Sequence, residues 1–146
     1  MYIMLSIHPQ YAEKILDGTK LWEYRKTLPT THLLDVTGVV VYATAPVSRI
    51  VGEFETDLTK TRTASPCKLW HETDGERDGG ITKEAFDKYF EGHDYGYAIP
   101  VLLYSGGSSA VRYDVPRRLA DFGLKKPPQG FAYLKKYNGL KTIGAE

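Results

Sequence analysis

Residues 18–26, GTKLWEYRK, place charged and aromatic side chains next to one another in a segment typical of a β-strand. Because side chains alternate along a strand, Lys20 and Trp22 are expected to share one face. Glu23 and Arg25 are then expected on the reverse face. A lysine beside a tryptophan supplies a positive charge next to a flat ring, a combination suited to phosphate pairing and base stacking. A lysine within a strand is disfavoured unless it is exposed or paired, so Lys20 is the first candidate for a functional residue.

The reverse face of this segment carries a second pair of chemical groups. Strand rise separates Glu23 from Arg25 by about 7 Å. A glutamate can accept a hydrogen bond from a base amino group, and an arginine can donate to a carbonyl or phosphate. Glu23 can also act as a general base for water while Lys20 stabilises an oxyanion. A purely structural alternative stays open, in which Glu23 and Arg25 form an ion pair and Arg25 braces a loop carbonyl.

Other catalytic signatures are missing from the sequence. The glycines of DGERDGG lack the lysine and the preceding strand of a phosphate-binding loop, and SGGSSA contains no GxSxG. Cys67 and His71 lie four residues apart, but a zinc site needs two more ligands and none is nearby. We therefore expect neither a metal nor a cofactor. Carboxylates of the acidic loop, Glu72, Glu76 and Asp78, are further candidates for a hydrolytic site.

Length and composition indicate one domain with a sizeable core. The chain has 146 residues, of which 42% are hydrophobic and 25% charged. A single cysteine fits a reducing compartment, and neither a signal peptide nor a membrane-spanning stretch is apparent. These features predict a cytoplasmic protein that does not enter membranes.

The net charge of +1 conceals an asymmetry along the chain. Residues 112–146 contain eight Lys or Arg and three Asp or Glu, whereas residues 1–111 contain eleven basic and fifteen acidic residues. A basic C-terminal third is the pattern of a nucleic-acid surface, and it is also the pattern of an ordinary solvated face.

Periodicity predicts the elements around residues 18–26. Residues 6–18 are expected to form a helix with Pro9 in its first turn and Gly18 after its end. Residues 38–44 and 48–56 read as strands, and residues 80–92 as a helix capped by Thr82. A helical turn is expected at residues 67–72, with further strands at residues 95–105 and 110–115. Pro100 is expected at an edge or bulge.

The segment SIHPQYAEKILDGTKLWEYRK resembles the start of the ASCH domain, a branch of the PUA-like superfamily. The family hallmark is a helix ending in glycine followed by G-x-K-x-x-E-x-R, matched here by Gly18, Lys20, Glu23 and Arg25. The resemblance extends from residue 3 to about residue 135. It implies an α+β fold, a small mixed β-barrel of five or six strands with two or three short helices. The domain is expected to span residues 1–137, with residues 138–146 as a frayed tail.

The resemblance also implies a cleft that binds RNA or modified nucleosides. Besides Lys20, Trp22, Glu23 and Arg25, the side chains expected to line this cleft are Tyr42, Thr44, Glu53, Tyr95 and Tyr97. The alternative is a hydrolase, amidohydrolase-like or ribonuclease-like, that uses Lys20 and Glu23. An acetylcytidine amidohydrolase of the superfamily has a threonine where this chain has Glu23, which argues against that reaction here. A regulatory, protein-binding role is a third class, for which the sequence shows no partner groove.

Overall fold

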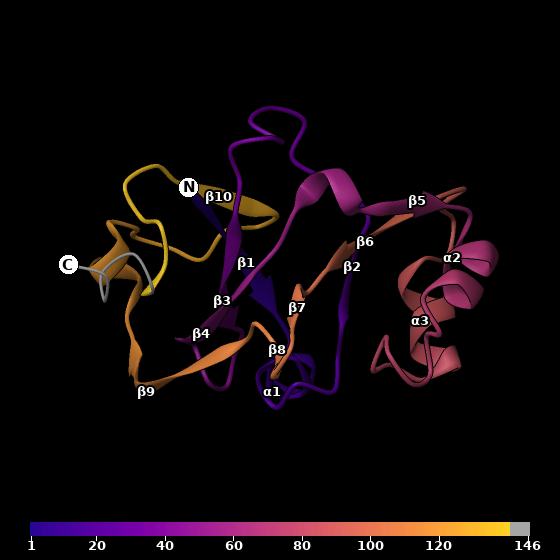
Figure 1. The fold of residues 1–146 in the computed structure, drawn as a ribbon, viewed down its shortest axis with the longest axis horizontal. Helices are drawn as coiled ribbons and strands as arrows, with labels where there is room; N and C mark the ends of the chain where they lie inside the picture. The colour runs from indigo at the N-terminus through magenta and orange to yellow at the C-terminus, as the bar shows by residue number, and fades with distance from the viewer. Residues whose placement is uncertain (141–146) are drawn as a thin grey trace.

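Three β-sheets organise residues 1–140, the part of the chain that this computed structural model describes (Figure 1). The larger sheet has the order β10-β1-β3-β4-β9, formed by β1 (Tyr2–Ile7), β3 (Gly38–Ala43), β4 (Arg49–Glu55), β9 (Val111–Arg117) and β10 (Phe131–Leu134). The second sheet has the order β2-β6-β5, formed by β2 (Trp22–Arg25), β5 (Arg62–Ala64) and β6 (Gly96–Pro100). The third is the hairpin of β7 (Leu103–Tyr104) and β8 (Gly107–Ser108).

Short helices pack around these sheets. They are α1 (Pro9–Leu16), α2 (Pro66–Glu72) and α3 (Lys83–Tyr89), with the 3₁₀ turns η1 (Leu58–Lys60) and η2 (Leu119–Phe122). Figure 1 shows α2 and α3 at the end of the molecule beyond β5 and β6. The predicted α+β class is confirmed. Over residues 1–140 the hydrogen-bonded strand order does not close into a ring, so the barrel stays a prediction.

Strand β1, which lies between β10 and β3 in the larger sheet, is absent from the sequence-based strand predictions. It pairs in parallel with β3 and antiparallel with β10, and five of its six residues are buried. A strand covered on both faces carries apolar residues without alternation, so the usual period of two is lost. The prediction of an edge or bulge for Pro100 is wrong, because Pro100 ends β6, the middle strand of its sheet, and pairs in register with Trp22.

Helix α1 forms as its sequence predicts. Pro9 occupies the first turn, where a missing amide proton costs nothing, and Gly18 has φ of 87° just past the helix end. The buried stripe is Ala12, Ile15 and Leu16. Thr82 likewise caps α3, since its side chain accepts a hydrogen bond from the Ala85 amide at 3.2 Å. None of the helices in the described range is long and apolar enough to cross a bilayer.

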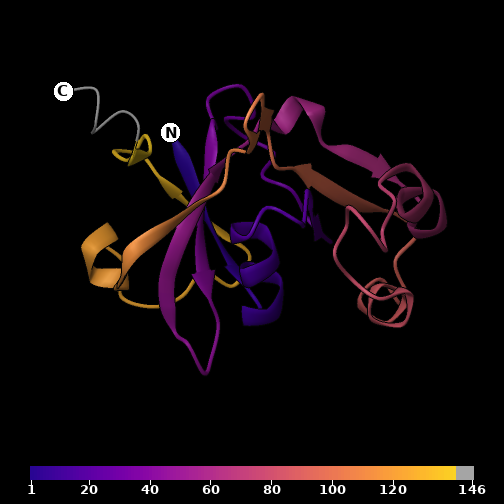
Figure 2. The ribbon, with the colours of Figure 1, turned by 60° about the horizontal axis from the view of Figure 1, so that its bottom comes forward.

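Three apolar clusters fill the interior. The first lies on one face of the larger sheet and includes Ile7, Ile15 and Phe54. The second covers the opposite face of that sheet, beneath η2 and the segment after β10. The third joins the smaller sheet to α2 and α3. Figure 2 shows α1, in indigo, between the larger sheet and the smaller one.

Gly52 of β4 offers a test of how tightly α1 is held against the larger sheet. A Cβ at this position would collide with the carbonyl oxygen of Val111 and with the side chain of Leu16. We expect Gly52→Ala to lower the free energy of unfolding by about 1–3 kcal/mol, the usual cost of overpacking. Urea unfolding checks this against Gly106→Ala, where an added Cβ meets nothing within 4 Å. Equal stability of the two variants would contradict the packing described here.

The predicted tail is described only in part. The Leu140 amide donates a hydrogen bond to Glu53 Oε2 at 2.9 Å, which holds residue 140 against β4. Residues 141–146 lie outside the described residues, so the prediction of a frayed tail is untested for them.

Candidate functional site

A cavity of about 610 Å³ lies between α1, β2 and α3 and reaches the segment before β10. The lining that bears on its chemistry consists of His8, Tyr11, Lys20, Glu23, Arg25 and Tyr89. Lys20, Glu23 and Arg25, the charged residues of the sequence motif, therefore meet in one hollow.

Lys20 reaches this hollow from a different backbone position than the one predicted. The strand begins at Trp22, and residues 19–20 instead fold back onto the end of α1. The amides of Thr19 and Lys20 both donate to the Lys14 carbonyl, at 3.1 and 2.9 Å. The expected alternation from residue 18 onward is therefore wrong for Lys20.

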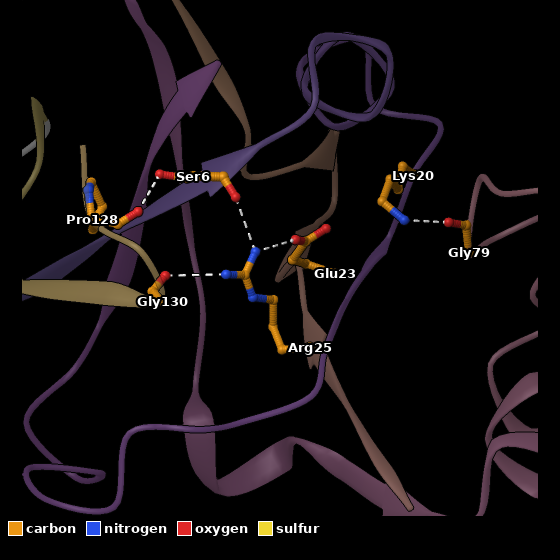
Figure 3. A network of polar contacts seen from close by, with 7 residues as sticks. All are labelled: Ser6, Lys20, Glu23, Arg25, Gly79, Pro128 and Gly130. Atoms are coloured by element: carbon orange, nitrogen blue, oxygen red, sulfur yellow. Dashed lines mark hydrogen bonds and ion pairs between the residues drawn. The ribbon is translucent and has the colours of Figure 1, made fainter. Parts of the chain in front are cut away.

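The Lys20 side chain is buried, with 2% of its surface exposed. Its ammonium group donates a hydrogen bond to the carbonyl of Gly79 (Figure 3). The ring centroids of Tyr24 and Tyr11 lie 4.9 and 5.3 Å from Nζ, within cation–π range. One carbonyl and two aromatic rings thus replace the water that normally surrounds a lysine.

Burial is the main cause of an altered acidity at Lys20. It lowers the pKa of Lys20 from 10.5 to about 8, with a further lowering from nearby Lys14 that Glu23 opposes. Lys20 therefore exists as both ammonium and neutral amine near neutral to mildly alkaline pH. A lysine in this state can pair with an anion or accept a proton.

The glycines after the acidic loop explain the burial. Gly79 supplies the carbonyl that Lys20 contacts, and a side chain at Gly79 would collide with Tyr24. The Lys20 side chain packs against Gly80. The acidic loop thus approaches the cavity through its backbone, and the carboxylates of Glu72, Glu76 and Asp78 are not part of the lining.

Glu23 and Arg25 form the ion pair that the structural alternative anticipated. Arg25 Nη1 lies 3.2 Å from Glu23 Oε2 and donates to the Ser6 carbonyl at 3.1 Å. Arg25 Nη2 donates to the Gly130 carbonyl, also at 3.1 Å. Figure 3 shows the guanidinium group between these partners, with Pro128 accepting from the Ser6 hydroxyl nearby. Arg25 therefore joins β2 to β1 and to the segment before β10, and both charged residues still line the cavity.

The other predicted site residues lie elsewhere. Trp22 packs in the third cluster, and Tyr97 contacts Tyr95 with ring centroids 5.9 Å apart. Tyr42 is buried in the second cluster, on the far face of the larger sheet. Glu53 lies on the same face, where it accepts a hydrogen bond from the Tyr113 hydroxyl. None of these side chains, nor Thr44 beyond the end of β3, lines the cavity.

Several lining residues escaped the sequence reasoning because helices bring them in. Tyr11 comes from α1, and Tyr89 and Lys88 come from α3. Lys26 lies with Nζ 4.6 Å from the ring centroid of Tyr89. Tyr89 belongs to the helix predicted at residues 80–92, and it is half-buried at the cavity. Across the described lining, four cationic side chains (Lys20, Arg25, Lys26 and Lys88) face a single carboxylate.

Comparison with known proteins shows what this chain is similar to. No family model matches the chain. The ribosomal protein uL22 of Ureaplasma parvum is 31% identical over 134 residues, or 91% of this chain, and the ATP synthase subunit alpha of the same organism is 34% identical over 133 residues. The chain spans 39% and 15% of the length of these two relatives. An ASCH domain-containing ribonuclease of Zymomonas mobilis is 24% identical over 141 residues and is matched over 88% of its length.

Solved structures share the fold. A tyrosine-to-phenylalanine variant of the Zymomonas mobilis ASCH protein superposes with a TM-score of 0.76 and 21% identity, covering 98% of this chain and 96% of that one. A serine-to-alanine variant gives 0.76 and 22%. These likenesses define an α+β domain of the ASCH type. In fold, and in sequence over nearly its whole length, this chain is therefore similar to the ASCH proteins of Zymomonas mobilis.

Proposed function

We propose that the cavity beside β2 binds RNA or a modified nucleoside. The observation that carries this proposal is the meeting of Lys20, Glu23 and Arg25 at one cavity with more cations than carboxylates in its described lining. Its volume of about 610 Å³ lies within the range of small-molecule sites, about 300–1,000 Å³. Tyr89 offers a ring for stacking, and Lys26 and Lys88 offer charges for phosphate. The name of the Zymomonas relative, a ribonuclease, supports RNA as the ligand class.

Binding of a short fluorescent single-stranded RNA tests this proposal. We expect affinity to fall as salt rises, since phosphate contacts release counterions. Removing two cavity cations by Lys26→Ala with Lys88→Ala should flatten the slope of log affinity against log salt by about 1.4, or about 0.7 for each phosphate contact. The matched control is Lys60→Ala with Lys68→Ala, because both lysines are exposed and lie away from the cavity.

Aromatic substitutions separate stacking from charge. Tyr89→Leu removes a ring that lines the cavity, and Trp22→Leu removes a ring that does not. We expect only Tyr89→Leu to weaken binding, by about 1–3 kcal/mol, the usual value of one base stacked on an aromatic ring. RNA binding that is absent, insensitive to salt, or equally weakened by both pairs of lysine changes would overturn the proposal.

The lowered pKa of Lys20 favours hydrolysis as a second candidate function. A neutral amine can take a proton from water or from a ribose 2′-hydroxyl, and the neighbouring lysine charges can stabilise a phosphate that gains negative charge. Incubation with an RNA pool and, separately, with N4-acetylcytidine tests for turnover. Product from either substrate should vanish in Lys20→Met, which keeps the side-chain volume but has no titrating group. Unchanged product formation in that variant would exclude Lys20 as the base.

A further inference from the structure

A second hollow, of about 640 Å³, lies next to the opposite end of β10 from the first cavity. Gln129 and Gly130, just before β10, line the first cavity. Residues 134–137, at the end of β10 and beyond, line the second, together with Arg117 and η2 residues. Both hollows therefore border one edge strand of the larger sheet.

Three cationic side chains gather at this second hollow: Arg117, Lys135 and Lys136. Within residues 1–140 none of them is in an ion pair. The carboxylate in the lining is that of Asp121, which accepts a hydrogen bond from the Arg118 amide at 2.9 Å. The hollow thus holds positive charge that the described chain does not neutralise.

Aromatic rings line the hollow, and two rings, one of them outside the lining, contact its arginine. The Arg117 guanidinium carbon lies 4.3 Å from the ring centroid of Tyr113 and 5.9 Å from that of Phe122. Tyr137 meets Phe122 edge to face at 5.2 Å. The position of Tyr137 is fixed by a hydrogen bond that its hydroxyl donates to the buried carboxylate of Glu53. Contacts within the protein therefore hold Arg117 and Tyr137 at the hollow.

One loop connects the two hollows. Gly123 and Leu124 line the second hollow, and the same loop ends at Gln129 and Gly130 in the first cavity. Between them Lys125 and Lys126 are exposed. Figure 2 shows this segment leaving η2, passing toward α1 and turning back as β10. Exposed positive charge therefore continues from one hollow toward the other.

We infer that the second hollow binds the phosphate backbone of a single-stranded RNA whose other end occupies the first cavity. Unpaired cations beside aromatic rings are the combination that binds single strands without sequence preference. Lys125 and Lys126 carry the strand between the hollows. This inference rests on the proposed function of the first cavity and extends it to a ligand several nucleotides long.

A length series of oligouridine separates the two sites. The variant Arg117→Gln with Lys135→Ala and Lys136→Ala removes the three cations of the second hollow. We expect a 3-nucleotide RNA to bind wild type and variant equally. A 12-nucleotide RNA should bind wild type more tightly than the short one and lose roughly tenfold in affinity in the variant, with a salt slope flatter by about 2 (about 0.7 for each of three phosphate contacts).

Controls keep each outcome interpretable. Lys60→Ala with Arg62→Gln and Lys68→Ala removes three exposed cations that line neither hollow and should leave both affinities unchanged. Lys135→Ala with Lys136→Ala keeps Arg117 on its rings and should show a partial loss even if the triple variant unfolds. Equal affinity for both RNA lengths, or no effect of either variant on the long RNA, would overturn the inference while leaving the first cavity intact.

Two further outcomes point elsewhere. Failure of wild type to bind the short RNA would count against the first cavity, and length-dependent loss in the variant would still support the second hollow. Poly-glutamate tests for an acidic protein segment as the ligand. If it binds wild type as tightly as the 12-nucleotide RNA at equal salt, and the triple variant loses this binding, the RNA assignment would be overturned.

Discussion

When the pH rises from 7 to 9.5, the free energy of unfolding of the wild-type protein is expected to increase by about 2 kcal/mol relative to that of Lys20→Met. The pKa of Lys20 is about 8 in the folded protein and 10.5 in the unfolded chain. Between these values the unfolded state binds more protons than the folded state, so stability rises with pH. Below about pH 8 both states are protonated and the folded protein holds a buried ammonium group.

Urea unfolding of both proteins at each pH measures this difference. The variant removes the titrating amine and retains the neighbours that face it, Glu23, Lys14 and Tyr11. Tyr24 also faces Lys20, and burial raises the pKa of Tyr24 to about 12, so its titration lies above the range used. A pH-independent difference between the two proteins would show that Lys20 titrates as an ordinary exposed lysine.

The same titration distinguishes the two candidate functions. If Lys20 pairs with phosphate as an ammonium ion, RNA affinity falls as the pH passes about 8. If Lys20 acts as a base, turnover rises over the same range because the neutral amine becomes the major form. Neither trend is expected in Lys20→Met.

Glu53→Leu is expected to lower the free energy of unfolding by at least about 1–3 kcal/mol, the usual cost of leaving one buried hydrogen-bonding group without its partner. Glu53 is 4% exposed and accepts hydrogen bonds from the hydroxyls of Tyr113 and Tyr137 and from the Leu140 amide. Leucine fills much of the same space but removes the carboxylate that accepts from these three donors. Thermal and urea unfolding measure the loss.

A double-mutant cycle tests whether the loss comes from these hydrogen bonds. Tyr137→Phe removes one donor, so its cost should be smaller in the Glu53→Leu background than in wild type. Additive costs would show that Glu53 and Tyr137 are not coupled. The cycle also bears on the second hollow, because Tyr137 is one of its lining residues.

Local signals in the sequence predicted the local structure around the site well. The first-turn proline and the terminal glycine marked the two ends of α1, and the Thr82 cap marked the start of α3. The grouping of Lys20 with Glu23 and Arg25 came from a motif and was reproduced, although its strand-based explanation was wrong for Lys20. Alternation applies only within a strand, and Lys20 lies in the turn that closes α1.

Long-range packing is the part that the sequence did not disclose. Tyr42 and Glu53 lie on strands that the sequence indicated, but the face that each presents depends on β1 and on what covers the larger sheet. Gly79 acts on Lys20 from 59 positions away along the chain. Two adjacent glycines before a capped helix were the available signal that backbone approaches closely there.

The clamp made by Arg25 has a consequence for the energetics of recognition. Its guanidinium group donates hydrogen bonds to two carbonyls and one carboxylate of the protein. These contacts hold together the parts of the cavity wall that come from β1, β2 and the residues before β10. A ligand that drew Glu23 away would still leave both carbonyl contacts in place. An incoming molecule therefore meets a preorganised wall, and little of its interaction energy is lost to ordering the host.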